Sequence, residues 1–238
     1  MEDDVEEGTV PVSYTLDFSF LAESWQRFLE GAWLTIQLAS VAIVLGFVVG
    51  TVRAVLRTNG DRVTSCIVGA YVEVIRNTPL LVQIFIVYFG LSTLGVKISA
   101  ELSAALALII NVGAYTTEIM RAGVESIARS QIEAADCLGL SRLQVFWHII
   151  LLPAVERVYP ALSSQFVLLM LASSITSQIS AEELTATANL VQSQTFRTFE
   201  VYIVVAGIYL ALSFLFRGTF WLIGQALFVR RRKLGTAL

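Results

Sequence analysis

Long stretches without a charged residue constrain this chain more than any other feature of its sequence. A helix of about 20 apolar residues crosses the ~30 Å hydrocarbon core of a bilayer, because each residue adds ~1.5 Å. Shorter stretches suffice if flanking charged side chains extend toward the lipid headgroups. The uncharged stretches are Trp33–Val52, Thr78–Val96, Leu102–Thr117, Val158–Ala181 and Val201–Phe216. We therefore predict an all-α integral membrane protein with five transmembrane helices.

The composition supports a membrane protein over a soluble one. Only 15% of the residues are charged and 56% are hydrophobic, whereas soluble domains carry about 25% charged residues. The alternative is a large soluble core, but a chain of 238 residues would rarely bury five such segments. No internal repeat or low-complexity linker is visible, which indicates a single domain.

The basic residues predict the orientation in the membrane. Lysine and arginine concentrate after the first predicted span, after the third and at the C-terminus, and cytoplasmic loops carry such an excess. With five spans the two ends lie on opposite sides, so we expect the N-terminus outside and the C-terminus inside the cell. The basic residues placed inside are Arg53, Arg57, Arg62, Arg121, Arg129, Arg142, Arg157, Arg230, Arg231, Arg232 and Lys233, and those placed outside are Arg27, Lys97 and Arg197.

The chain divides into three predicted regions. Residues 1–30 form an extracytoplasmic segment, residues 31–229 the transmembrane domain, and residues 230–238 a basic cytoplasmic tail. We expect no cleavable signal peptide, because the acidic start is not followed by a short apolar region. Within the first region an amphipathic helix is predicted, although a simple extension of the first span fits equally well. Its apolar residues at helical spacing are Phe18, Leu21, Trp25 and Phe28.

A pair of glycines lies in the first predicted span. Gly46 and Gly50 are four residues apart, and small residues at this spacing let two helices approach closely in lipid. The pair is a candidate helix contact.

A proline interrupts the second predicted span. Cys66–Ile75 is apolar except for Glu73, and Arg76, Asn77, Thr78 and Pro79 follow. Proline lacks a backbone N–H and its ring clashes with the preceding turn, and such a break is tolerated where protein or water covers it. The chain then either kinks within the membrane or ends an interfacial helix and begins the span near Thr78. A third possibility is an ordinary helix start with proline in its first turn.

The third predicted span carries three polar residues on one helix face. Asn111, Tyr115 and Glu118 follow one another at i, i+4 and i+7. A carboxylate in lipid is costly, so we expect it to face protein or a water-filled path. The alternative is that Glu118, near the cytoplasmic end, pairs with Arg121 or Arg129 at the interface.

The segment between the third and fourth predicted spans has the pattern of helix, tight turn and helix. Ser130 with Glu133 and Ser141 with Gln144 fit the capping box that begins a helix. Gly139 stands where the first helix must end, in a left-handed C-terminal position. Such an element suits docking onto a cytoplasmic partner, because small side chains let another surface come close, and the first helix carries Ala134 and Ala135.

This segment resembles the EAA signature of ABC importer permeases, EAA-x3-G-x9-I-x-LP. Glu133-Ala134-Ala135 and Gly139 stand in register, and Phe146, Ile149 and Ile150-Leu151-Leu152-Pro153 follow. Further stretches are similar to the polar amino acid subfamily, which serves histidine, glutamate, glutamine, arginine and opines. They are Gly31 with Thr35, Val72–Gln83 and Asn111–Gly123, and the likeness covers roughly residues 30–225.

The resemblance implies the permease subunit of an ATP-driven importer in the bacterial plasma (inner) membrane. It would move a polar amino acid or similar small polar solute into the cell by alternating access. The family's coupling helix docks on the ATPase, which assigns that role here to Glu133, Ala134, Ala135 and Gly139. Glu133 could instead only cap its own helix. On this hypothesis Asn111, Tyr115 and Glu118 line the solute pathway.

The resemblance also implies the partners. In this family two permease subunits form the pathway, two ATPase subunits drive it and an extracytoplasmic binding protein delivers the solute. The second permease would be another copy or a related paralogue. The chain has no Gly-Lys-Ser/Thr phosphate loop, so we expect it to bind no cofactor, with ATP and Mg used by the partner ATPase. Membrane lipid surrounds it, and no nucleic acid is expected.

One stretch departs from the family pattern. The family often has Lys-Asp-Thr-Ser-Leu in the fourth span, where this chain has Leu171-Ala172-Ser173-Ser174-Ile175. This change weakens any transfer of substrate details. Glu182-Glu183-Leu184 after it does resemble the family's ending of this region.

Two other classes of protein compete with this interpretation. A stand-alone secondary transporter usually has inverted repeats and more spans, neither of which the sequence shows. An intramembrane enzyme would need a catalytic cluster, and the single histidine, His148, has no metal-ligand set or Ser–His arrangement around it in the predicted spans. We therefore expect a transport subunit without a metal site.

Overall fold

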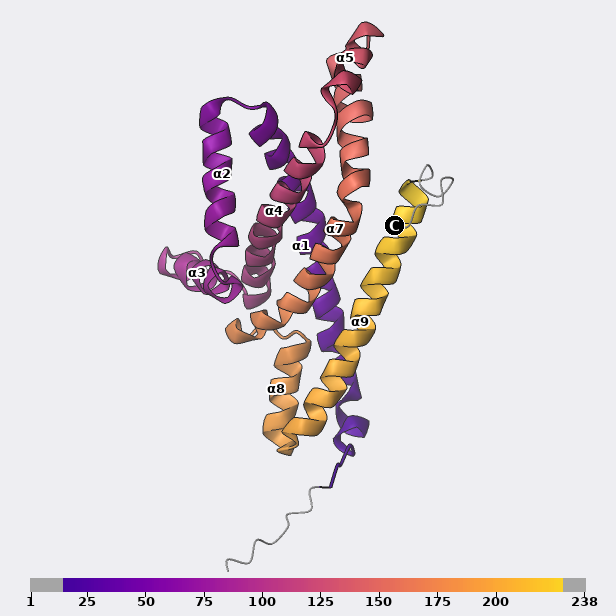
Figure 1. Ribbon diagram of the computed structural model, residues 1–238. Coiled ribbons are helices and arrows are strands. Elements are labelled where there is room, and N and C mark those ends of the chain that lie inside the picture. Colours follow the sequence, from indigo (N-terminus) through magenta and orange to yellow (C-terminus); the bar gives the residue numbers. More distant parts are fainter. Residues whose placement is uncertain (1–14, 229–238) are drawn as a thin grey trace, which may run out of the picture.

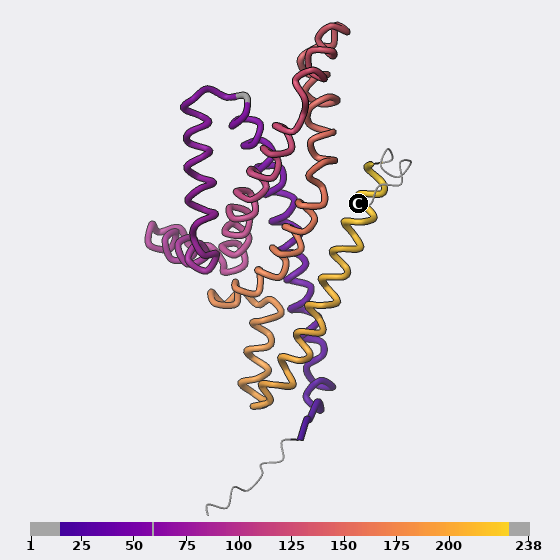
Figure 2. Tube along the Cα trace, viewed as in Figure 1, coloured from indigo at the N-terminus to yellow at the C-terminus, as the bar shows by residue number. Residues whose placement is uncertain are grey.

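The computed structural model describes residues 15–228, apart from the side chain of Asn59, and every regular element in that range is helical (Figures 1 and 2). Residues 1–14 of the predicted outer segment and the predicted basic tail, residues 230–238, lie outside the described residues. The α-helices are α1 (Phe20–Asn59), α2 (Arg62–Arg76), α3 (Leu80–Thr93), α4 (Ala100–Glu125), α5 (Arg129–Cys137), α6 (Arg142–Gln144), α7 (Leu152–Ala172), α8 (Leu184–Thr195) and α9 (Thr198–Leu227). A π-helix, η1 (Val145–Leu151), precedes α7, and a 3-10 helix, η2 (Ser173–Ile179), follows it.

Five potential membrane spans are present in this part of the chain. Phe20–Thr58, Ala100–Glu125, Arg142–Ile179 and Thr198–Leu227 are each long and apolar enough to cross a bilayer. The pair α2 and α3 passes the same test together and bends by 107° at a short break. The predicted all-α membrane fold is confirmed, with four candidate spans in the described residues, or five if the bent pair α2 and α3 is one span.

Helix α1 is continuous through the region predicted as a separate outer segment. It runs from Phe20 to Asn59 without a break, so residues 20–30 are its first turns and extend the first span. A helix of this length measures ~60 Å, about twice the hydrocarbon thickness of a bilayer. Part of α1 therefore extends beyond the hydrocarbon core, and its N-terminal end lies beside α8 and the start of α9 (Figure 1). The short helix α5 lies at the opposite end of the molecule.

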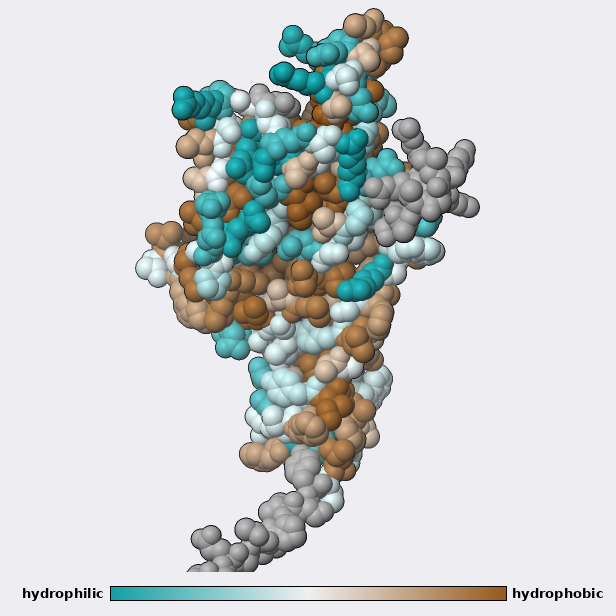
Figure 3. Space-filling model, in the orientation of Figure 1, coloured by the Kyte–Doolittle hydropathy of each residue, from teal (hydrophilic) through white to brown (hydrophobic). Residues whose placement is uncertain are grey.

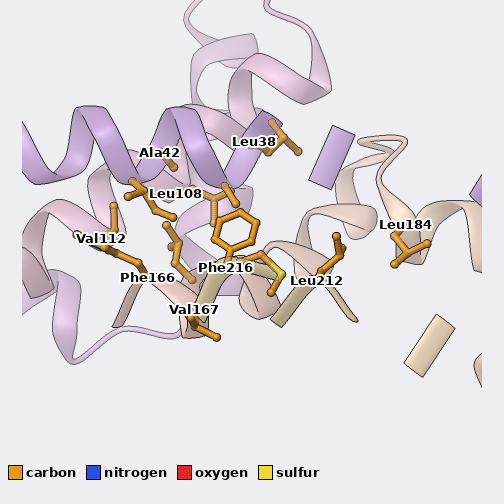
Figure 4. Close-up of a cluster of buried hydrophobic side chains, with 14 of the residues drawn as sticks. Leu38, Ala42, Leu108, Val112, Phe166, Val167, Leu184, Leu212 and Phe216 are labelled. Carbon is orange, nitrogen blue, oxygen red and sulfur yellow. The ribbon is translucent and has the colours of Figure 1, made fainter. Parts of the chain in front are cut away.

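The core is built around the close contact of α1 with α4. A Cβ atom on Gly46 would lie 2.2 Å from Cγ1 of Val112, and one on Gly50 would lie 2.6 Å from Cβ of Thr116. The predicted glycine pair is thus a real helix contact, because only a hydrogen fits at these two positions. Figure 4 shows the apolar side chains that converge beside it, from α1 (Leu38, Ala42), α4 (Leu108, Val112), α7 (Phe166, Val167) and α9 (Leu212, Phe216).

Candidate functional site

The turn after α5 has the conformation that its sequence predicts. Gly139 has φ +74°, a left-handed conformation that favours glycine. The backbone N–H of Leu140 donates to the Ala135 carbonyl over 3.2 Å, and that of Gly139 donates to the Asp136 carbonyl over 3.0 Å. These two bonds form a Schellman motif. Gly139 therefore ends α5 and turns the chain sharply into the next helix.

One of the two predicted capping boxes is present. Gln144 accepts a hydrogen bond from the Ser141 backbone N–H over 2.9 Å, and its own N–H donates to Ser141 Oγ over 3.4 Å. The box predicted for Ser130 and Glu133 is wrong. Helix α5 already begins at Arg129, and its N-cap residue is Ala128, which has no side chain able to cap. The alternative role of Glu133, capping its own helix, is therefore not seen either.

The exposed surface of the α5 turn contains both polar and apolar residues. Glu133, Ala134 and Gly139 are exposed, whereas Ala135 is buried against the chain itself. Two leucines not predicted from the sequence flank the glycine, and their exposed fractions are 81% for Leu138 and 67% for Leu143. We call this exposed set, Glu133, Ala134, Leu138, Gly139 and Leu143, the α5 tip. Exposed leucines on a turn at the end of the membrane helices favour a partner surface.

A π-helix joins the α5 tip to the fourth span. In η1 the hydrogen bond that closes the element runs from the Leu152 N–H to the Trp147 carbonyl, five residues back. Pro153 follows at once, and it has no N–H for the carbonyl four residues before it. The wider π turn accommodates the missing bond. His148 lies in η1 and is exposed, with Nδ1 3.2 Å from the Gln144 carbonyl oxygen.

The helix break forms at the predicted proline and is held by a residue to which no role was assigned. Pro79 is the N-cap of α3. The Gln83 side-chain amide, buried one turn later, donates to the Ile75 carbonyl over 2.7 Å and to the Thr78 carbonyl over 3.0 Å. These carbonyls come from the end of α2 and from the break, and the Ile75 carbonyl also accepts the Thr78 N–H over 3.4 Å. A glutamine in the otherwise apolar α3 was the signal available in the sequence.

The three polar residues of α4 face α2, α3 and the end of α1, as their spacing predicts. Asn111 is buried, and its Nδ2 donates to Gln83 Oε1 over 3.0 Å. Tyr115 lies under the Arg76 guanidinium, whose carbon is 5.4 Å from the ring centroid. The predicted break and the predicted pathway residues therefore form one polar cluster, although they are far apart in the sequence.

Glu118 is paired with arginines on two helices. Its carboxylate lies 2.7 Å from Arg57 Nη1 of α1 and also contacts Arg121. Arg121 additionally pairs with Glu125. The predicted alternative, an ion pair of Glu118 with Arg121, is thus confirmed, whereas no bond to Arg129 is present among the described side chains. At the same end the Arg53 guanidinium carbon lies 4.1 Å from the Tyr71 ring centroid.

A second polar cluster lies at the other end, where α1 meets the start of α8. Thr35 Oγ1 lies 3.0 Å from the Gly31 carbonyl oxygen and 3.4 Å from Glu183 Oε2, and it accepts the Leu184 N–H over 3.2 Å. A Cβ atom on Gly31 would lie 3.0 Å from Leu184 Cα. The motif residues of the first span and those before α8 are thus in direct contact.

Glu183 is fully buried in this cluster. It caps α8 by accepting the backbone N–H groups of Thr185 and Ala186 over 2.9 and 3.1 Å, and it accepts the Tyr209 hydroxyl of α9 over 2.7 Å. Burial raises the pKa of Glu183 above its ordinary value of 4.5, because the charged form loses hydration. The carboxyl group ties three helices together.

The stretch that departs from the family pattern marks a change of helix type. Helix α7 ends at Ala172, and Ser173 begins the 3-10 segment η2. The buried Ser173 and Thr176 hydroxyls donate to the Met170 and Ser173 carbonyls, both over 2.7 Å. The hydroxyl groups satisfy backbone acceptors at this change of helix type.

Comparisons with known proteins agree with this architecture. The family model described as binding-protein-dependent transport system inner membrane component matches residues 42–232. A nopaline transport system permease protein of Agrobacterium fabrum is 35% identical over 209 residues, covering 84% of this chain and 87% of the relative. A probable glutamine ABC transporter permease protein of Bacillus subtilis is 36% identical over 198 residues, covering 83% and 92%.

Solved structures give the same result. An amino acid ABC transporter crystallised with histidines superposes with a TM-score of 0.80 and 33% identity, covering 90% of this chain and all of that one. The methionine ABC transporter MetNI, at 18% identity, shares the fold with a TM-score of 0.71. The predicted location in the bacterial inner membrane is confirmed by the family description. The chain belongs to the family of binding-protein-dependent transport system inner membrane components and is an ABC permease subunit, not a catalytic enzyme.

Proposed function

We propose that this permease imports a polar amino acid or an opine, driven by separate ATPase subunits that dock on the α5 tip. The observation that carries the proposal is the α5 tip itself. It combines the family's Glu-Ala-Ala and glycine residues with a left-handed turn and two exposed leucines at one end of the membrane helices. The relatives named for nopaline, octopine and glutamine support the solute class.

The link from the α5 tip to the spans supports a mechanical role. Helix α5 packs on η1, which continues directly into α7. A displacement of α5 by an ATPase would therefore reach the fourth span through the π-helix. In this proposal Ala135 positions α5 on η1, whereas Glu133, Ala134 and Gly139 face the ATPase. Of the four predicted coupling residues, one would thus contact the permease itself and three would contact the ATPase.

The polar cluster of α4 supports the proposed pathway in a modified form. Asn111 holds the helix break through Gln83, and Glu118 is neutralised by arginines. In this proposal both residues position the pathway wall, and Tyr115 and Arg76, at its surface, are the ones that meet the solute. Figure 3 shows hydrophilic side chains gathered on the face over α4 and the neighbouring parts of α2.

The proposed importer also contains a second permease and a binding protein. A second permease, either another copy or a paralogue, completes the pathway, and an extracytoplasmic binding protein delivers the solute at the end that holds α8. The N-terminus lies outside and the C-terminus inside in this arrangement. ATP and Mg are used by the ATPase, and this chain binds no cofactor.

Reconstitution in proteoliposomes tests the proposal. The permease, its ATPase and its binding protein should take up radiolabelled L-glutamine, octopine or nopaline only when ATP is present. The second candidate, a secondary transporter, would take up the solute under an imposed ion gradient with the permease alone. ATP-independent uptake by the permease alone would overturn the proposed function.

A further inference from the structure

A groove with apolar walls lies between three of the candidate membrane spans. It has a volume of about 690 Å³ and is lined by residues of α1, of η1 and α7, and of the last turns of α9. The Phe166 ring centroid lies 6.3 Å from that of Phe47 and 5.6 Å from that of Phe220, so the three walls meet at this level. The α1 wall runs from Ile43 to Leu56, which is about 20 Å along a helix axis. The groove therefore follows the direction of the spans.

The walls of the groove offer hydrocarbon contacts and few polar ones. Among the lining residues only Thr51, Trp147 and Tyr159 carry a side-chain N–H or O–H group. Thr51 Oγ1 is buried, and the Tyr159 hydroxyl is used within the chain, where it donates to a backbone carbonyl of α9 over 2.6 Å. Val48 and Val52 of the α1 wall are exposed. Apolar surface on membrane helices is covered either by lipid tails or by another helix, so the groove takes an apolar occupant.

Positive charge borders the groove at the ends of two walls. Leu227 is the last groove residue of α9, and the basic run Arg230–Lys233 begins three residues after it, which is at most about 11 Å along an extended chain. On the η1 wall Arg142 is exposed one helical turn before Phe146, and in residues 15–228 no carboxylate lies within ion-pair distance of it. Trp147 on this wall is also exposed, and tryptophan is enriched where membrane helices meet the lipid headgroups. None of the lining residues is acidic.

These features favour a phospholipid over the other possible occupants. A helix with its side chains is about 11 Å across, so a 20 Å length of it fills roughly 1,900 Å³, which is far more than the groove holds. The residues that follow α9 in the sequence are mostly basic and do not suit an apolar groove. An acyl chain is narrower than a helix, and a polybasic segment directly after a membrane helix attracts anionic lipids.

We propose that the groove between α1, α7 and α9 binds an acyl chain of an anionic phospholipid from the leaflet at the α5 end, with the lipid phosphate facing Arg142 and the basic run Arg230–Lys233. The inference goes beyond the proposed function, because it does not depend on the solute. The π-helix η1 forms part of the groove wall. A bound lipid would therefore support the element that joins the α5 tip to the fourth span.

Phospholipid binding to the purified permease–ATPase complex tests the site. Phosphatidylglycerol and phosphatidylcholine with identical acyl chains would be titrated separately into the complex in detergent, and native mass spectrometry would count the bound lipids. Wild type should bind phosphatidylglycerol saturably and phosphatidylcholine roughly 10-fold more weakly. Val48→Trp should fill the groove and remove the saturable binding. Val41→Trp makes the same change at an exposed α1 residue outside the groove and should bind as wild type does.

A charge variant tests the recognition of the headgroup. Arg230→Gln, Arg231→Gln and Arg232→Gln combined should weaken binding of phosphatidylglycerol by roughly 10-fold and leave binding of phosphatidylcholine unchanged. The matched control, Arg27→Gln, Arg62→Gln and Lys97→Gln combined, removes the same charge from exposed residues outside the groove and should bind both lipids as wild type does.

A second blocking variant guards against a failure of Val48→Trp to fold. Ile223→Trp fills the groove from the α9 wall and should also remove the saturable binding, with an unfolding midpoint close to that of Val41→Trp. Equal binding of the two lipids by wild type, or unchanged binding in the blocking variants, would overturn the inference. Blocking variants that split a pair of permeases on size exclusion and still bind phosphatidylglycerol would show that a second copy fills the groove, which would also overturn it.

Discussion

Replacing Gln83 with leucine should destabilise the permease by breaking the hydrogen bonds that hold the bend between α2 and α3. Leucine fits the volume of the buried side chain but leaves the Asn111 amide without its partner. The Ile75 carbonyl loses the bond from Gln83 but still accepts from the Thr78 N–H and hydroxyl. Each buried polar group left unpaired costs about 1–3 kcal/mol. Water can replace the bond to Thr78, because Thr78 is exposed.

The expected loss is therefore about 1–3 kcal/mol. For a chain of this size, 1 kcal/mol lowers the unfolding midpoint by roughly 2–4 °C, so the midpoint should fall by about 2–12 °C. Fluorescence-detected thermal unfolding in detergent measures this shift. The matched control is Gln225→Leu, which changes a half-buried glutamine of the apolar helix α9 and should shift the midpoint little.

A double variant tests the stated cause. Asn111→Leu combined with Gln83→Leu removes both hydrogen-bond partners, so no unpaired buried amide remains. The loss of unfolding free energy in the double variant should therefore be smaller than the sum of the two single losses by about 1–2 kcal/mol. The reasoning is refuted if Gln83→Leu behaves like Gln225→Leu, or if the two single losses simply add.

Further predictions concern packing and pH. Gly50→Ala should lower the unfolding midpoint, because overpacking the contact with α4 costs about 1–3 kcal/mol, whereas Gly207→Ala, with nothing within 4 Å of the added Cβ, should leave it unchanged or raise it slightly. Equal shifts in the two variants would contradict the close contact. The raised pKa of Glu183 means that its protonated form favours the folded state, so its contribution is fully present below the unfolded pKa of about 4.5 and is lost as pH rises through the folded pKa. Thermal unfolding between about pH 4 and pH 8 should show this loss in wild type and in the exposed neighbour Glu182→Gln but not in Glu183→Gln, and an unchanged pH profile in Glu183→Gln would disprove it.

The features predicted well from the sequence are those governed by local rules. Charge-free length identifies the spans, Pro79 identifies the break, and Gly139 identifies the left-handed turn, because each depends on one residue type or one continuous stretch. The contact of Gly46 and Gly50 with α4 was also predictable as a close approach, but its partner helix was not.

The features that were missed depend on tertiary contacts. Gln83 is the only glutamine of the apolar helix α3, and only the folded chain shows that its side chain holds the bend. The capping box predicted at Ser130 fails because α5 begins two residues earlier than the serine pattern suggests. Of the two alternatives for residues 20–30, the structure has the extension of the first span, because no breaker separates these apolar residues from it.

Co-purification from membranes tests the central claim, that the α5 tip couples this permease to an ATPase. A tagged wild-type chain in mild detergent should retain the ATPase. Gly139→Val should lose it, because a β-branched residue strains the left-handed turn. Gly95→Val places the same change at another left-handed glycine, outside the α5 tip and also in open space, and it should retain the ATPase. A wild-type chain that purifies folded and alone, or a Gly139→Val chain that keeps the ATPase as wild type does, would contradict the account.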